Sequence, residues 1–175
     1  MVNSFLRQRS AVRRMVAAVA MAGAGVMPAP SLLAAPPGAD PLAHLAGRWV
    51  GDAVMTTAAG PTSNFKCVVT YLPRKDAPGM QQNLRCDDGS GFKLNAATEI
   101  AVEDGKVTGR WKDKINELDG TVAGNITPDG FVIQLAGRFF AAKMAVSGSG
   151  CNQSVKVMPD SSEVFRELAA TLKKC

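Results

Sequence analysis

Residues 64–86, NFKCVVTYLPRKDAPGMQQNLRC, decide the fold of this chain. Two runs of alternating residues, 64–72 and 80–86, flank a loop with two prolines and a glycine. This pattern predicts two antiparallel strands joined as a hairpin. If the hairpin is symmetric about residues 76 and 77, Cys67 and Cys86 lie opposite each other, close to the separation that a disulfide needs.

The chain has four cysteines, and an even number in an exported protein is typical of disulfides. Three pairings are possible, and the spacing favours Cys67 with Cys86 and Cys151 with Cys175. Each bond closes a loop of roughly 20–25 residues and contributes about 3 kcal/mol in the loop-entropy model. The closely spaced cysteine pairs of zinc sites are not in the sequence, so we expect no metal centre.

The alternation continues on both sides of the hairpin. Further strands are expected at 49–56, 92–100, 107–111, 122–126, 131–135, 138–146 and 151–158. Asp-Gly dipeptides, which favour tight turns, stand at 88–89, 104–105, 119–120 and 129–130. We therefore expect an all-β antiparallel meander of eight or nine strands, closed as a β-barrel or folded as a curved sandwich.

A weak internal repeat supports a barrel. Residues 105–111 (GKVTGRW) resemble residues 120–126 (GTVAGNI), and each copy has a glycine in mid-strand, Gly109 and Gly124. Glycine inside a strand marks a bend or a close approach of another backbone, and a small barrel needs such bends.

The last residues, 160–175 (DSSEVFRELAATLKKC), predict a C-terminal α-helix on the barrel wall. Asp160 is a candidate N-cap, and Glu163 stands at the capping-box position. An apolar stripe with helical spacing follows, made of Val164, Phe165, Leu168 and Leu172.

The N-terminus has the order of a secretory signal peptide. Four arginines precede a short apolar stretch and then small residues, so we expect a signal peptide at 1–34, a Pro/Gly linker at 35–41 and one disulfide-bonded domain at 42–175. The mature protein is then periplasmic or secreted. The pair Arg13-Arg14 leaves open whether export follows the general secretory or the twin-arginine route.

Charge and hydropathy exclude two classes of partner. The net charge of +5 includes the four arginines of residues 1–34, and the remainder has 16 basic against 15 acidic residues. A nucleic-acid-binding domain needs a basic surplus in its folded part, so we expect no nucleic-acid partner. No apolar run reaches the roughly 18–20 residues of a membrane-spanning helix.

Few residues with catalytic potential are present. His44 is the single histidine and precedes the first strand, and the cysteines are assigned to disulfides. The acids Asp113, Glu117 and Asp119 allow a calcium loop, but a solvated turn fits their spacing better. We expect no cofactor and no enzymatic activity; an enzyme that uses carboxylates alone is the third-ranked hypothesis.

Two resemblances add to this interpretation. Gly47-Arg48-Trp49 at the start of a meander of this length looks like the calycin barrels (lipocalins, fatty-acid-binding proteins and avidins), in which the tryptophan closes one barrel end. The wider pattern of GRW, CVVTY, QNLRC, GRW and CNQS over residues 47–158 resembles a family of small exported bacterial proteins without an established activity. That family implies export and the cysteine framework, but no catalytic residues.

The leading hypothesis is a non-enzymatic barrel that binds a small apolar ligand. Its candidate ligand-binding residues are Trp49, Tyr71, Trp111, Phe140 and Met144. Small residues at inward positions leave room for a cavity but equally fit a packed core. The alternative is therefore an envelope or secreted interaction protein, for example an inhibitor, with a filled core and working loops at 73–79 or 58–64.

Overall fold

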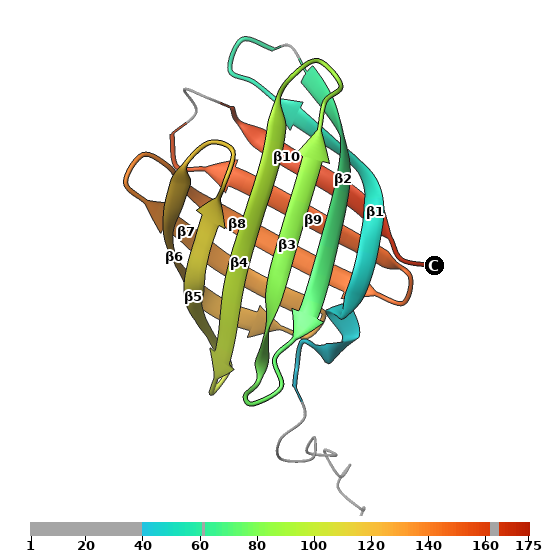
Figure 1. The fold of residues 1–175 in the computed structure, drawn as a ribbon, viewed down its shortest axis with the longest axis vertical. Helices are drawn as coiled ribbons and strands as arrows, with labels where there is room; N and C mark the ends of the chain where they lie inside the picture. The colour runs from blue at the N-terminus through green and yellow to red at the C-terminus, as the bar shows by residue number, and fades with distance from the viewer. Residues whose placement is uncertain (1–39, 61, 162–164) are drawn as a thin grey trace, which may run out of the picture. The chain divides into compact units, whose positions relative to one another are not determined.

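The computed structural model describes residues 40–60, 62–161 and 165–175 as a closed antiparallel barrel of ten strands (Figure 1). The predicted signal peptide, 1–34, and residues 35–39 of the predicted linker lie outside the described residues. The elements are the 3-10 helix η1 (Ala43–Leu45), β1 (Gly47–Thr56), β2 (Thr62–Pro73), β3 (Gly79–Asp87), β4 (Lys93–Glu103), β5 (Lys106–Asp113), β6 (Leu118–Thr127), β7 (Gly130–Gly137), β8 (Ala141–Ser149), β9 (Asn152–Pro159) and β10 (Glu167–Lys173).

Each strand pairs with its neighbours in the chain, and the pairing of β1 with β10 closes the ring. The predicted all-β antiparallel barrel is thus confirmed, and the sandwich alternative is excluded. The predicted number of eight or nine strands was wrong. All nine predicted strands are present, with shifted ends, and the tenth comes from the tail.

The predicted C-terminal helix is a strand instead. Residues 167–173 form β10, which pairs with β1 on one side and β9 on the other. Leu168 and Leu172 are four residues apart, a spacing that suits one face of a helix and also one face of a strand. Leu168, Ala170 and Leu172 all point into the barrel. The edges of β1 and β9 supply backbone hydrogen-bond partners on both sides, and these partners favour the strand over the helix.

Two further details of the meander differ from the prediction. The Asp119-Gly120 dipeptide lies inside β6, and the turn before it spans residues 114–117, where Glu117 has a positive φ of 53°. Gly120 is needed for close packing, because a Cβ there would lie 2.0 Å from the carbonyl oxygen of Ala136 and 2.7 Å from Nε1 of Trp111. The strand expected at 138–146 begins only at residue 141.

Both predicted disulfides are present. Cys67 and Cys86 are directly opposed in the β2–β3 ladder with Cα atoms 4.2 Å apart, as the symmetric hairpin required. Cys151 and Cys175, with Cα atoms 5.3 Å apart, join the β8–β9 turn to the residues after β10. The first bond is buried in the barrel interior, whereas the second links the closing strand to the adjoining hairpin.

The mid-strand glycines are sites of close backbone approach, as the repeat predicted. A Cβ at Gly109 would lie 1.7 Å from the carbonyl oxygen of Glu99, and one at Gly124 would lie 2.1 Å from that of Val132. No side chain fits such a distance, so these positions let the strands bend around the barrel.

Candidate functional site

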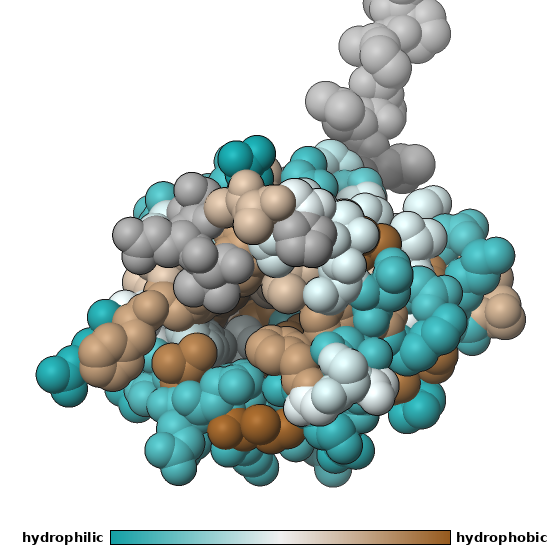
Figure 2. All heavy atoms as spheres, turned by 90° about the horizontal axis from the view of Figure 1, so that it is seen from above, coloured by the Kyte–Doolittle hydropathy of each residue, from teal (hydrophilic) through white to brown (hydrophobic). Residues whose placement is uncertain are grey.

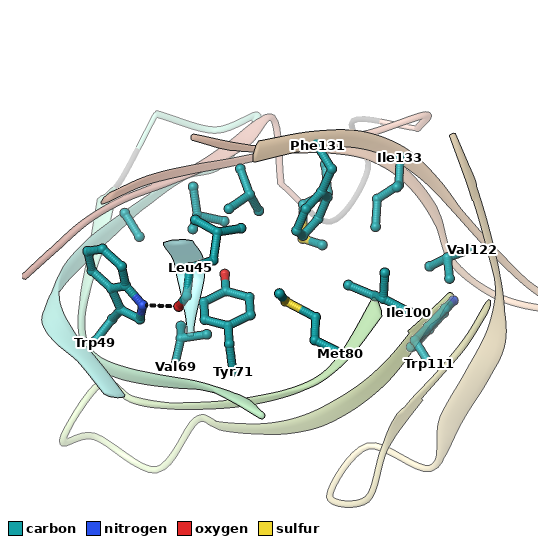
Figure 3. Close-up of a cluster of buried hydrophobic side chains, with 14 of the residues drawn as sticks. Leu45, Trp49, Val69, Tyr71, Met80, Ile100, Trp111, Val122, Phe131 and Ile133 are labelled. Atoms are coloured by element: carbon teal, nitrogen blue, oxygen red, sulfur yellow. Dashed lines mark hydrogen bonds between the residues drawn. The ribbon is translucent and has the colours of Figure 1, made fainter. Parts of the chain in front are cut away.

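One end of the barrel, the closed end, is sealed by η1 and the first residues of β1. Leu42 and Leu45 are completely buried there, and the indole Nε1 of Trp49 donates a hydrogen bond of 2.7 Å to the Leu45 carbonyl (Figure 3). Lys174 covers the Trp49 ring, with Nζ 4.7 Å from its centroid, and donates to the His44 carbonyl. This end therefore has a packed floor that is held in place by both ends of the domain.

The opposite end, the open end, is bordered by the β1–β2, β3–β4, β5–β6, β7–β8 and β9–β10 loops (Figure 1). Figure 2 looks onto this end and shows a hollow between the loops with apolar atoms at its border. Several inward-facing apolar side chains towards this end are only partly buried. They form two opposed arcs, which we call the chamber: Met55, Leu168 and Val157 on β1, β10 and β9, and Leu84, Ala96 and Leu94 on β3 and β4.

Partial exposure of inward-facing side chains is informative because the barrel wall shields them from outside. Leu84 and Ala96, which are direct cross-strand neighbours, are partly exposed although they lie on the inward-facing side of their strands. Towards the closed end, the inward-facing residues of the same two strands, such as the paired Met80 and Ile100, are fully buried. The interior is therefore packed at the floor, whereas towards the open end partly exposed side chains lie beside buried ones such as Phe65 and Cys86.

A polar group lies deep in the interior, near the packed floor. The Gln82 amide donates to the Tyr71 hydroxyl over 3.2 Å, and Gln153 on β9 reaches the same region. These three side chains are at most 3% exposed. Burial raises the pKa of the Tyr71 hydroxyl far above its usual value, and its amide neighbours Gln82 and Gln153 oppose the shift only partly. Tyr71 is thus a neutral phenol at any physiological pH.

An aromatic group stands at the open end. The rings of Trp111 and Phe140 meet edge to face with centroids 5.9 Å apart, and Phe140 stacks on Phe165 at 6.2 Å. The Trp111 indole is 7% exposed, and its Nε1 has no hydrogen-bond partner among the described residues. This group joins β5 to the β7–β8 loop, to which Phe140 belongs.

The five predicted ligand-binding residues all belong to the interior or pack against it, at different depths. Trp49 is in the floor, Tyr71 lies just above it, and Met144 lies on β8 opposite Val157. Trp111 and Phe140 come together near the open end, and the structure does not bring them to Trp49. Their role in binding a ligand stays a prediction.

Two of the residues considered for catalysis or calcium, Asp113 and His44, have structural partners. Asp113 is 1% exposed, and its carboxylate accepts hydrogen bonds from the backbone N–H of Ile115 and the side chain of Asn116, which fixes the β5–β6 turn. His44 is exposed in η1, with Nε2 3.1 Å from the carbonyl oxygen of Asp129.

Sequence reasoning missed Gln82 and Gln153. The signal was present, because Gln82 shares the parity of Met80, Leu84 and Cys86 along β3. Bulky and titratable residues alone do not reveal this group, because Gln82 and Gln153, the buried polar residues of β3 and β9, are neither.

No family model and no curated protein matches this chain. The resemblances to calycins and to the small exported bacterial family therefore remain expectations. The structure shows two features that they imply, the closed β-barrel and the two disulfides. Within residues 40–60, 62–161 and 165–175, helical structure nowhere attains the length and apolar character that crossing a bilayer demands.

Two grooves also lie against the outer wall. One, of about 470 Å³, runs between Arg74 and Arg110, and another, of about 630 Å³, borders the ion pair of Lys66 with Asp52. Both are wide open to solvent, and neither contains a buried polar group that lacks a partner. The chamber and the deep polar group therefore form the better candidate site.

Proposed function

We propose that this protein is an exported, non-enzymatic barrel that holds one small, predominantly apolar ligand in its chamber. The observation that carries the proposal is the partial exposure of inward-facing apolar side chains above a sealed floor. Water in contact with apolar surface is unfavourable, and a ligand that replaces it gains the corresponding transfer free energy. Export agrees with the two disulfides, which persist in oxidising compartments.

The tenth strand supports a hollow interior. With strands about 4.8 Å apart and tilted by about 40°, ten strands close on a backbone radius of about 10 Å, against about 8 Å for eight strands. Several inward positions around this wider ring hold only small side chains, among them Ala53, Ala96, Ala142 and Ala170. Ala53, Ala142 and Ala170 are buried against larger neighbours, so the room for a ligand that we propose lies at the level of Ala96.

The chamber suits moderate affinity. A ligand that buries about 300 Å² of its own apolar surface and covers a similar area of the chamber gains roughly 15 kcal/mol from the hydrophobic effect. The loss of translational and rotational freedom on binding and the ordering of side chains cost several kcal/mol of this gain. We therefore expect dissociation constants in the micromolar range for a purely apolar ligand.

The test is a titration with N-phenyl-1-naphthylamine, a neutral apolar fluorophore, in the folded, disulfide-bonded protein. Ala96→Phe fills the chamber, and Ala97→Phe adds the same ring to the outer face of the same strand. We expect saturable one-to-one binding by the wild type, at least a tenfold loss in Ala96→Phe and no change in Ala97→Phe, with far-UV circular dichroism as the folding control.

Binding that is absent in the wild type, or equal in both variants, contradicts a ligand chamber. The better-supported function would then be that of an interaction protein whose barrel core is filled by its own side chains. One observation favours it: exposed apolar side chains at the open end, with Phe139 77%, Ile115 50% and Phe92 46% exposed. They lie on loops other than the two that the sequence suggested.

A further inference from the structure

The deep polar group contains a polar side chain whose hydrogen bonds are not satisfied. Gln153 is 2% exposed, yet neither its Nε2 nor its Oε1 has a hydrogen-bond partner among the described residues. Its amide lies near enough to the Tyr71 hydroxyl to oppose the rise of that group's pKa, but not in hydrogen-bond geometry. Buried amides in native proteins nearly always have partners, so a donor and an acceptor left over on one side chain require an explanation.

The position of Gln153 connects it to the chamber. It pairs with Gly148 on β8 and Leu172 on β10, and all three face the interior. Val157, at the level of the chamber, stands four residues further along β9, which corresponds to about 13 Å. Figure 3 shows the Tyr71 side chain pointing into the same interior from the opposite wall. A ligand of about this length along the barrel axis would therefore reach from the chamber to the level of Gln153.

The charges around this position decide which polar group fits. Among the described buried residues the only charged one is Asp113, and its carboxylate is engaged in the β5–β6 turn at the open end. A carboxylate or phosphate brought to Gln153 would have no cation beside it, and an ammonium group would have no anion. Burying an unpaired charge is strongly unfavourable, so the matching group is uncharged.

We infer that the ligand enters with its polar end first and that this end is an uncharged group with an adjacent donor and acceptor, such as a carboxamide, held by Gln153. The inference rests on the proposed function and adds the chemical class of the ligand: a neutral amphiphile with an apolar tail. The Gln153 Oε1 accepts from the ligand's N–H, and its Nε2 donates to the ligand's carbonyl oxygen. The Tyr71 hydroxyl lies next to the Gln153 amide and accepts a hydrogen bond from Gln82, so both belong to the polar group that would receive the ligand.

The experiment compares three ligands with the same tail: dodecanamide, dodecanoate at pH 8 and dodecane. Each displaces N-phenyl-1-naphthylamine from the wild type, and we expect the amide to bind at least tenfold more tightly than the other two. Gln153→Leu removes both polar atoms, and Gln153→Met keeps the length of the side chain. Gln81→Leu, on the outer face of β3, is the matched control.

We expect Gln153→Leu to lose the preference for the amide while it keeps the affinity for the fluorophore and the stability of the unliganded protein. A merely structural glutamine would lower stability on substitution and leave the order of the three ligands unchanged. Equal displacement by all three ligands, or an amide preference that survives in both Gln153 variants, overturns the inference alone. Failure of the wild type to bind the fluorophore or any of the three ligands overturns the proposed function as well.

Discussion

Removal of the Cys151–Cys175 disulfide tests how the barrel is closed. The bond joins residues 24 positions apart and links the chain after β10 to the β8–β9 turn. A loop of this length is worth about 3.5 kcal/mol in the loop-entropy model. For a domain of this size the loss corresponds to a fall in Tm of about 10 °C or more. The double variant Cys151→Ser/Cys175→Ser should therefore be folded but clearly less stable.

The structure also predicts where the variant loosens. Lys174 follows β10, donates its backbone N–H to the Cys151 carbonyl, and covers the Trp49 ring of the floor. Without the disulfide these contacts have no covalent support, so the amides of β10 and η1 should exchange with solvent faster than those of β3 and β4. Urea unfolding followed by circular dichroism gives the free energy, and hydrogen exchange gives the location.

The matched control is Cys67→Ala/Cys86→Ala. That bond joins residues 19 positions apart, so its loop contribution is nearly the same, about 3.3 kcal/mol. Its sulfur atoms are buried, and their removal adds a packing loss. We expect this variant to be the less stable of the two. A loss below about 1 kcal/mol for Cys151→Ser/Cys175→Ser, with unchanged exchange in β10, refutes the reasoning, because the β-ladders alone would then hold the closing strand.

Two further predictions concern single residues of the interior. Tyr71 is the only tyrosine of the sequence, and its pKa is raised in the folded state, so the folded protein keeps a proton that the unfolded chain releases above about pH 10. The free energy of unfolding should therefore fall as pH rises beyond 10, by up to about 1.4 kcal/mol per pH unit. The Tyr71→Phe variant should lack this pH-dependent loss. Tyrosinate absorbance that develops in the folded wild type near pH 10 would contradict the raised pKa. Gly109→Ala places a Cβ against the Glu99 carbonyl and should cost about 2 kcal/mol or more in urea unfolding. Gly150→Ala has open space around it and should cost only the roughly 1 kcal/mol of an alanine at the positive φ of 56°. A loss for Gly109→Ala no larger than that for Gly150→Ala would show that the bend at Gly109 does not need glycine.

The sequence was sufficient for the features that depend on local pattern. Alternation located the nine strands from β1 to β9, and the symmetry of one hairpin placed Cys67 opposite Cys86. These features depend on residues that are close in the chain, where period and turn chemistry act directly.

The errors concern residues whose conformation depends on distant partners. The segment that forms β10 has good helix formers and an apolar spacing common to both conformations, and only the free edges of β1 and β9 select the strand. Gly120 was interpreted as a turn residue, although the space under the Trp111 ring requires it. Gln153 became significant only when the barrel showed that nothing pairs with it among the described residues.

The pairing of β1 with β10 also sets the order of folding. Every other ladder joins strands that follow one another in the chain, whereas residues 53 and 170 meet across almost the whole domain. Contacts of such long range form last, because their loop-closure entropy is compensated only after the local hairpins exist. Until β10 is in place, the growing sheet has two unprotected edges, β1 and β9, that can pair with another chain. Completion of the barrel is thus the step that ends this risk of aggregation, and the Cys151–Cys175 bond then makes it durable.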